Sequence, residues 1–245
     1  PTDMKATADK YYDDYNLMDL RVISTLGLTD NDVNDIKNID GVEGVEPSKS
    51  LDVLSKVGSE EFVIRMHSIP NSNLTDNNEN YINRLKVVEG RLPEKEGECV
   101  IGKYSFGDLN INVGDTITVR SGNDTDINES LNSSEYKVVG IVETPYYLSN
   151  NIGSSTIGSG TVKLSMFLNE DNFKNDVYTD IYVTVKNTKM LNSYDDEYFE
   201  VVDKVSNSIE DISNVIVERR YEQVKDLANS ELQKGKEEYE TKKNE

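Results

Sequence analysis

The side chains that most often carry chemistry are scarce in this chain of 245 residues, which has one cysteine, Cys99, and one histidine, His67. A zinc site built from His and Cys needs several such ligands, and an internal disulfide needs two cysteines, so the composition excludes both. Cys99 follows Glu98 in an expected strand and has no basic neighbour at strand spacing, so we expect a buried, unreactive thiol. His67 ends another expected strand beside Ile69, where a neutral surface or half-buried imidazole is the ordinary interpretation, because catalysis would need a partner side chain.

One acidic segment resembles the ligand spacing of a calcium loop. Asp124, Asp126 and Asn128 alternate along it, and Glu135 follows eleven residues after Asp124. Glu129 stands where a calcium loop needs its turn glycine, and expected strands rather than helices flank the segment. A solvated loop is therefore the favoured interpretation, no metal site is assigned, and calcium at 124–135 stays an open alternative.

The segment from Gly153 to Gly160 has the flexibility of a phosphate-binding loop but lacks the lysine that would neutralise nucleotide phosphates. We expect no cofactor and no catalytic residue in this chain. Paired acids such as Asp13 and Asp14 arise from the composition alone, since 46 residues are acidic.

An aromatic segment nearby is the candidate for contact with a partner or a substrate. Burial against a β-rich lobe is the favoured alternative, because tyrosine is more often a packed residue with a solvated tip than a binding hot spot. The candidate contact residues are Pro145, Tyr146, Tyr147, Leu148, Ile157 and Gly158.

Charge narrows the classes of partner. The formal net charge is −20, and the sequence pI is near 4.4. Such a surface repels phosphates and attracts cations over long distances, which argues against nucleic-acid binding and favours cationic partners. The apolar share of 36% is low but is concentrated in periodic runs, so we expect an ordered core with long polar loops.

The first part of the chain is expected to contain helix, then β-α-β-β. Apolar residues recur at helical spacing over residues 4–15, and 19–26 has the pattern of a strand that ends at Gly27. Thr29 begins a helix that extends to about Ile39, and strands follow at 51–54 and 61–66 around a turn at Gly58.

A related unit is expected near the other end. Residues 180–185 have the pattern of a strand, apolar residues from Tyr198 to Ile212 recur at 4,3,4,3 spacing as in a helix, and 214–218 is expected to close the unit as a strand. The two units suggest halves of one split subdomain.

Residues 71 to 177 between these units favour an inserted β-rich lobe. Short strands are expected at 99–101, 116–119 and 136–142. Two Asn-rich stretches, 71–83 and 121–134, have no apolar periodicity and are interpreted as solvent-exposed loops.

The last part of the chain, from residue 221, is expected to begin a coiled-coil helix that stands away from the body. Lysine and glutamate are nearly balanced there. The stripe consists of Tyr221, Val224, Ala228, Leu232 and Tyr239, with Gly235 between the last two. No stretch approaches the ~18 apolar residues of a membrane helix. Because the chain begins at Pro1 and stops within a charged run, we expect a longer parent chain.

Taken in order, several of these segments are similar to one family. They are 7–12, 28–45, 90–93, 97–101, 113–119, 137–142, 144–149 and 156–160. The chain resembles the MacB-like core domain that lies between the first two membrane helices of FtsX-like ABC transporter permeases, here of the Gram-positive type. No single segment is specific, and the order gives the weight.

The resemblance implies an α+β fold in which a porter-like subdomain, formed by 1–70 and 178–220, is interrupted by the β-rich lobe at 71–177, with coiled coil from 221. It also implies flanking membrane helices, a location on the extracellular face of the cell membrane, a cytosolic ATPase subunit and a second permease copy or paralogue. The coiled coil departs from the shorter MacB pattern.

We therefore expect a non-enzymatic domain that couples cytosolic ATP hydrolysis to work outside the membrane. Movement would pass through the first and last helices, which the split subdomain is expected to bring together, and an extracellular protein or peptide could be contacted. The alternative is a ligand-binding surface receptor for cationic peptides, favoured by the net charge of −20.

Overall fold

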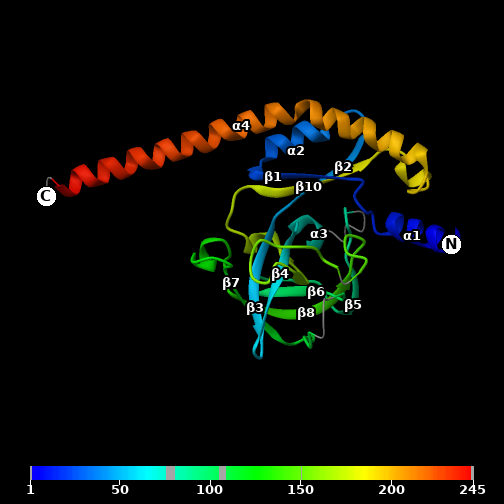
Figure 1. The fold of residues 1–245 in the computed structure, drawn as a ribbon, viewed down its shortest axis with the longest axis horizontal. Helices are drawn as coiled ribbons and strands as arrows, with labels where there is room; N and C mark the ends of the chain where they lie inside the picture. Colours follow the sequence, from blue (N-terminus) through cyan, green and yellow to red (C-terminus); the bar gives the residue numbers. More distant parts are fainter. Residues whose placement is uncertain (1, 76–80, 105–108, 150, 244–245) are drawn as a thin grey trace.

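The computed structural model describes residues 2–75, 81–104, 109–149 and 151–243, arranged as two sheet layers with a long helix across them (Figure 1). The helices are α1 (Thr2–Asp14), α2 (Asp30–Lys37), α3 (Asn71–Thr75) and α4 (Asp196–Lys243), with 3-10 turns η1 (Ile127–Glu129), η2 (Glu170–Asn172) and η3 (Thr188–Met190). The strands are β1 (Leu20–Leu28), β2 (Val42–Ser48), β3 (Ser50–Val57), β4 (Glu60–Ile69), β5 (Lys86–Gly90), β6 (Glu98–Gly102), β7 (Thr116–Arg120), β8 (Glu135–Glu143), β9 (Val162–Asn169) and β10 (Tyr178–Val185).

The small sheet is assembled from distant parts of the chain. Among the described residues it has three strands in the order β1-β10-β2, each antiparallel to its neighbour. Val183 in β10 pairs with Leu20 on one side and with Val45 on the other. Helices α2 and α4 lie over this sheet (Figure 1), and Ile181, Val183 and Val185 are buried in the core that the sheet shares with them. The central strand therefore comes from the far end of the sequence.

The large sheet closes on itself. Its strands in the described part of the chain follow the order β5-β8-β6-β9-β4-β3-β7, and β7 also pairs with β8. This extra pairing joins all of them except β5 into a ring, which removes the exposed edges that an open sheet would present. The pairs β4–β9 and β6–β8 are parallel, so the sheet is mixed. Where β5 meets β8, a Cβ on Gly90 would lie 2.1 Å from the carbonyl oxygen of Val139, so only glycine fits.

The large sheet has its own hydrophobic core. The largest buried side chains include Tyr136, Phe62 and Leu164, which belong to one continuous cluster. Cys99 lies in the same cluster, and burial raises the pKa of its thiol to about 12. The expectation of a buried thiol is therefore confirmed, and the raised pKa favours the unreactive protonated form.

Most elements expected from the sequence are present. The fold is α+β, with mixed sheets and a long C-terminal helix. Helices occupy the expected places at the start of the chain and after Thr29, and the expected strands at 19–26, 51–54, 61–66, 99–101, 116–119, 136–142 and 180–185 all lie within or overlap observed strands.

The strand expected at 214–218 is wrong, because these residues lie within α4. The Val-Ile-Val run is β-branched, as strands often are, but Ile216 continues the buried helical stripe of Val205 and Ile209 while Val215 and Val217 are 59% and 53% exposed. The helical conformation is favoured over a strand because it extends an existing apolar face. Helix α4 therefore runs without a break from the small sheet into the expected coiled-coil segment.

The grouping of strands also differs from the expectation. Strands β3 and β4 belong to the large sheet, where β4 pairs with β9 and β3 pairs with β7, although the sequence analysis placed residues 50–70 with the first unit. Strands β5 and β9 were not predicted. The partner of a strand is chosen by tertiary packing, which a local pattern does not contain.

The two Asn-rich stretches are not uniformly exposed, contrary to expectation. In 71–83, whose residues 76–80 lie outside the described part, α3 forms and Tyr81 and Ile82 are buried. In 121–134, η1 buries Ile127, and Leu131 also reaches the core of the large sheet. Single apolar residues anchor these loops in the core. Because such residues are isolated in the sequence, they produce no periodic pattern from which burial could be predicted.

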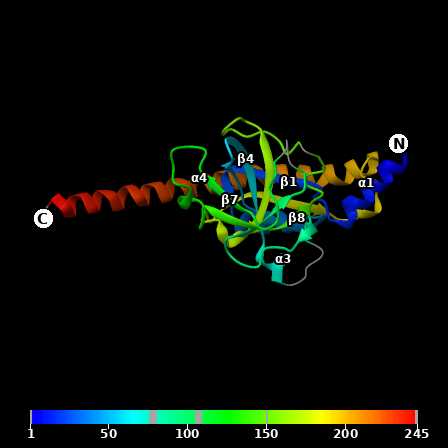
Figure 2. The same cartoon turned by 90° about the horizontal axis from the view of Figure 1, so that it is seen from below.

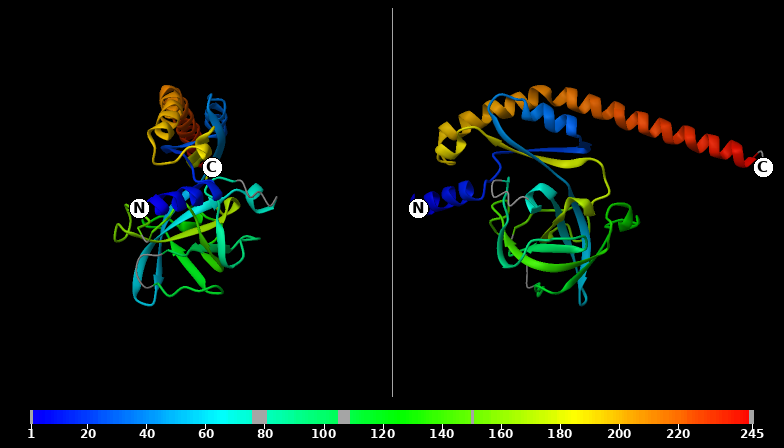
Figure 3. Two further views of the ribbon diagram at one scale, coloured as in Figure 1. Left: turned by 90° about the vertical axis from the view of Figure 1, so that its right-hand side faces the viewer. Right: turned by 180° about the vertical axis from the view of Figure 1, so that it is seen from behind.

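Helix α1 and the C-terminal end of α4 lie at opposite ends of the long axis (Figures 1 and 3). The expectation that the first and last helices are brought together is therefore wrong for the ends of the chain, because α4 continues past the small sheet instead of ending over it (Figure 2). The segment that enters α4 does meet α1. There the backbone N–H and the hydroxyl of Ser193 donate to Asp9 Oδ1 at 2.9 and 2.5 Å.

Candidate functional site at the joint between the layers

The connection from α1 to β1 is fixed by one carboxylate. Asp19 accepts hydrogen bonds from the Val185 backbone N–H at 2.7 Å, from Thr188 Oγ1 at 3.1 Å and from the Tyr198 hydroxyl at 2.8 Å. The donors belong to the end of β10, to η3 and to the first turn of α4. Burial raises the pKa of Asp19, while these hydrogen bonds act to lower it. The end of α1 is thus tied to the small sheet and to the helix that covers it.

The same connection is also tied to the segment that leads into the large sheet. The backbone N–H of Asn83 donates to the Asn16 carbonyl at 2.8 Å, and Arg84 donates its backbone N–H to the Tyr15 carbonyl at 2.9 Å. The Met18 backbone N–H donates to Asn83 Oδ1 at 3.0 Å. The Arg84 guanidinium lies 4.6 Å from the centre of the Tyr15 ring. Residues 15–19 therefore contact both layers.

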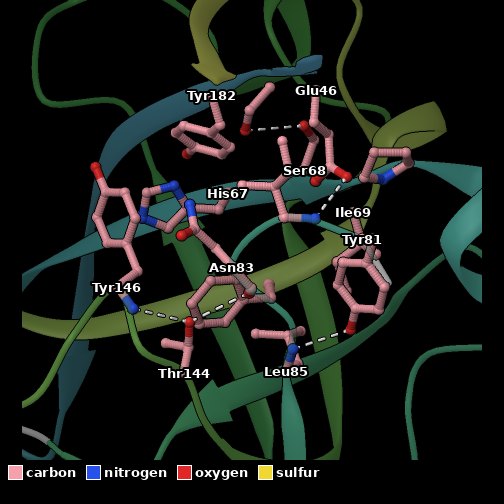
Figure 4. Close-up of a pocket in the computed structure, with 14 residues that line it drawn as sticks. Glu46, His67, Ser68, Ile69, Tyr81, Asn83, Leu85, Thr144, Tyr146 and Tyr182 are labelled. Atoms are coloured by element: carbon pink, nitrogen blue, oxygen red, sulfur yellow. Dashed lines mark hydrogen bonds between the residues drawn. The ribbon is translucent and has the colours of Figure 1, made fainter. Parts of the chain in front are cut away.

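Aromatic rings fill the space between the layers (Figure 4). His67 Nε2 and the Tyr147 hydroxyl are 2.7 Å apart, and the imidazole stacks on Phe167 with 5.2 Å between ring centres. The Tyr146 ring lies 5.4 Å from His67 and 5.7 Å from Tyr182 of the small sheet. These contacts make a continuous aromatic bridge from β4 and the turn after β8 to β10.

His67 is only 3% exposed, so the expectation of a surface or half-buried imidazole is wrong. Burial lowers its pKa to about 4, and the ring is therefore neutral near pH 7. Its Nδ1 is buried without a partner in the described part of the chain, beside a cavity of about 30 Å³. A cavity of this size can hold a water molecule. Because it is neutral and enclosed, the ring contributes to packing in the joint, which is the region where the small and the large sheet meet.

Two charged contacts complete the joint. Arg21 of β1 donates through Nε to Asp180 Oδ1 at 2.6 Å, and Ser50 Oγ donates to the other carboxylate oxygen of Asp180 at 3.0 Å. Asp180 thereby connects β10 to the first residue of β3. On the opposite side, Glu46 of β2 accepts from Asn73 Nδ2 at 3.1 Å and from the Ile82 backbone N–H at 3.2 Å. Desolvation raises the pKa of Glu46 to about 7.

The candidate contact residues do not form one exposed surface. Pro145 and Tyr147 are buried, Tyr146 is half-buried in the aromatic bridge, and Leu148 is 49% exposed. Ile157 packs against the same cluster as Tyr147. Gly158 is exposed, and a Cβ there would lie 2.7 Å from Leu54. The tyrosines thus serve the joint, and Leu148 is left at the surface.

The joint contains residues that the sequence analysis did not single out. They are Asp19, Arg21, Glu46, Asn83 and Asp180. Each is an ordinary polar residue in a chain that is rich in them, and nothing in its neighbours marks it. These residues become recognisable as part of the joint only in the folded structure, where segments that are distant in the sequence come into contact.

The other candidate sites have local structural roles. Asp126 caps η1 by accepting from the backbone N–H of Asn128 at 2.9 Å. Across the described ranges, no three His, Cys, Asp or Glu side chains gather in a way that could hold a metal ion. Within the same ranges, no helix is both long and apolar enough to cross a membrane.

The exposed stripe of α4 lies beyond the body of the molecule (Figure 2). Tyr221, Leu232 and Tyr239 are about three-fifths exposed, at 59%, 59% and 65%, and Val224 is 37% exposed. Ala228 is exposed as well. This helix therefore carries an apolar stripe without a partner helix in the described part of the chain.

The chain matches a known protein family over most of its length. The sequence profile of the MacB-like periplasmic core domain matches residues 3–197. No curated protein sequence matches the chain.

Solved structures provide weaker likenesses. The chain is similar to the extracellular domain of the noncanonic ABC-type transporter YknZ from Gram-positive bacteria, with 14% identity over 75% of this chain and 87% of that chain and a TM-score of 0.39. It is similar to the periplasmic region of MacB from Actinobacillus actinomycetemcomitans, with 13% identity, coverage of 78% and 75%, and a TM-score of 0.39. A permease domain from Porphyromonas gingivalis has 14% identity, coverage of 66% and 70%, and a TM-score of 0.31.

Proposed function

We propose, from the premise that this chain belongs to the MacB-like periplasmic core domain family, that it is the extracellular domain of an FtsX-like ABC transporter permease. In this role it couples ATP hydrolysis by a cytosolic ATPase subunit to work outside the cell membrane. It binds no nucleotide and catalyses no reaction itself. A second permease copy or paralogue completes the transporter, and an extracellular protein or peptide is a further partner.

The connection at residues 15–19 is the observation that carries this proposal. Asp19 binds the small sheet and α4, while the backbone of residues 15–18 binds Asn83 and Arg84 beside the large sheet. A displacement of α1 along its axis therefore acts on both layers at one point. Because the layers otherwise meet through aromatic packing and a few polar contacts, such a displacement is expected to change the angle between them.

We further propose a porter-like subdomain formed by the small sheet with α2 and the first part of α4. We put its first boundary near Lys49 instead of residue 70, because β2 pairs within the small sheet and β3 within the large one, and residues 178–220 would supply its second half. The β-rich lobe then extends from β3 to about residue 177. From Tyr221 onward, α4 is proposed to form one strand of a coiled coil through its exposed stripe.

The coupling role is testable by measuring the distance between the layers in the intact transporter. Spin labels at Lys56→Cys in the large sheet and Lys225→Cys on α4 report on the angle between the layers. Both positions are exposed, and the native thiol, Cys99, is buried. In nanodiscs with the ATPase, we expect the mean distance to differ by more than about 2 Å between the nucleotide-free and the ATP-trapped states.

A matched control pair lies within one layer. Labels at Lys37→Cys on α2 and Lys225→Cys on α4 report on elements that cover the same sheet, so their distance is expected to stay constant. Asp19→Ala, which removes the acceptor for three donors, is expected to reduce the change between layers. The coupling role would be refuted if the distance between the labels in the two layers were the same in the nucleotide-free and the ATP-trapped states.

A surface receptor for cationic peptides is the second candidate, favoured by the net charge of −20. It predicts saturable, salt-sensitive binding of a cationic peptide to this chain in the absence of any ATPase. Binding that only follows bulk charge, without saturation, would leave coupling as the better account.

A further inference from the structure

An open groove lies beside α1, outside the joint described above. Its volume is about 620 Å³, within the range of about 300–1,000 Å³ that small-molecule sites occupy. One wall is α1, through Ala8, Tyr11 and Tyr12, and the other is formed by Tyr104 and Leu148. Leu148 is 49% exposed, and burying such a side chain is favourable. The groove therefore has the shape and lining of a site for an apolar chain.

The charged residue that lines this groove, Glu143, has two basic partners. Glu143, at the end of β8, lines it and receives Lys103 Nζ at 2.5 Å and Lys86 Nζ at 3.7 Å. Both lysine side chains are about half exposed, at 47% and 49%. Two ammonium groups face one carboxylate, so this group of three side chains carries one net positive charge. Arg84 lies nearby, since it and Lys86 both approach the Tyr15 ring, at 4.6 and 6.0 Å.

This local charge is opposite to that of the whole molecule. The net charge of −20 acts over long distances, but physiological salt screens it within about 8 Å. The electrostatic energy of a headgroup bound here therefore depends mainly on Lys103, Lys86 and Glu143. A cationic headgroup would meet two ammonium groups there, and a neutral one would gain nothing from them, whereas an anionic headgroup can accept from both lysines.

We propose that the groove binds one anionic amphiphile. Its hydrocarbon chain lies between α1 and Leu148, against the rings of Tyr11 and Tyr104, and its acidic headgroup is held by Lys103 and Lys86. The occupant is a single molecule and not the surface of a bilayer, because the apolar part is a groove with two walls instead of a flat face. This binding does not depend on the coupling role proposed above.

The test uses the 245-residue chain and three detergents with the same dodecyl tail, each kept below its micelle concentration. Isothermal titration calorimetry with dodecyl phosphate is expected to show one site per chain. Dodecyltrimethylammonium and dodecyl maltoside are expected to bind at least about tenfold more weakly, which corresponds to at least about 1.4 kcal/mol. Equal affinity for all three headgroups would overturn the proposal, as would binding to anionic vesicles without binding of monomeric dodecyl phosphate.

Two variants with matched controls locate the site. Ala8→Phe fills the groove and should weaken dodecyl phosphate binding at least about tenfold, while Ala228→Phe on the exposed stripe of α4 should not change it. Lys103→Glu inverts the net charge of the group around Glu143 and should remove the preference for phosphate, while Lys56→Glu, also exposed, should keep it. Unaltered binding by Ala8→Phe, or an unaltered preference in Lys103→Glu, would show that the amphiphile binds elsewhere. Lys103→Glu keeps the test decisive if Ala8→Phe displaces α1.

Discussion

Two carboxylates at the joint, Asp180 and Glu46, differ in the donors that they have. Asp180 is 1% exposed and holds Arg21, Ser50 and Thr179, so each of its oxygens has a donor. Glu46 has two neutral donors, and no basic side chain is hydrogen bonded or ion-paired to it among the described residues. A buried carboxylate without a cation is costly in its ionised form. The stability of the joint is therefore expected to depend on pH through Glu46.

Replacing Glu46 with glutamine tests this dependence. The folded-state pKa of Glu46, about 7, lies above its ordinary value of 4.5, so the folded state favours the protonated form. Its contribution to stability is fully present below pH 4.5 and is lost as the pH rises through 7. Between pH 5 and pH 8, the free energy of unfolding of Glu46→Gln should fall less than that of the unmodified chain, by about 2 kcal/mol.

Urea denaturation at both pH values measures this difference. Glutamine keeps an oxygen that can accept from Asn73 and Ile82, so the hydrogen bonds are retained and only the charge is removed. Glu43→Gln, at an exposed position of the same strand, is the control and should behave as the unmodified chain. Parallel pH profiles for Glu46→Gln and the unmodified chain would contradict the prediction.

At the scale of elements, one side chain adds ion pairs to the apolar packing between α2 and α4. Arg219 donates to Asp32 at 2.7 Å and to Asp35 at 2.6 Å, and the Asp32 side chain is 1% exposed. The same Asp32 carboxylate accepts from the backbone N–H of Thr29 at 2.7 Å in the first turn of α2. This contact fixes the position at which α4 leaves the small sheet.

Arg219→Ala should therefore destabilise the chain by about 1–2 kcal/mol, because Asp32 is left buried without its cation. Thermal or urea unfolding measures the loss. Lys225→Ala, which breaks an exposed ion pair with Glu222 on the same helix, is the control and should cost less than about 0.5 kcal/mol. Equal effects of the two substitutions would mean that the α2–α4 contact contributes little.

For the whole molecule, the projecting part of α4 decides how the chain associates. Its stripe is thin, and Gly235 costs about 1 kcal/mol relative to alanine within a helix. Helices within proteins gain most of their stability from packing an apolar face, and this segment lacks such packing in the described part of the chain. The stripe alone is therefore expected to be too weak for stable dimers.

We expect this chain to be a monomer in dilute solution. Sedimentation velocity over a hundredfold range of concentrations, for example about 1 to 100 μM, should give one sedimentation coefficient, and Leu232→Ser should not change it. A dimer that persists at the lowest concentration and is lost in Leu232→Ser would contradict the prediction and would identify α4 as a dimer interface.

The sequence alone determined the class of the fold, the family and most of the individual elements. Local patterns were sufficient for the elements, because apolar residues at helical spacing predict a helix, and a run of β-branched residues between turn residues predicts a strand. Thr29 and Asp32 marked the start of α2, and Cys99 was correctly assigned to a buried strand. The family was identified from the order of several short segments along the chain, and that order can be read directly from the sequence.

Only the tertiary structure decided which strands pair and which polar residues meet. Residues 214–218 contain a β-branched run typical of a strand, but the helical face that precedes them continues and packs, so α4 extends without a break. Asp19 meets Tyr198, and Glu46 meets Ile82, across long stretches of chain. Burial and partner choice depend on the whole fold, whereas a local pattern is short-ranged, and for that physical reason neither the joint nor the groove beside α1 was visible in the sequence.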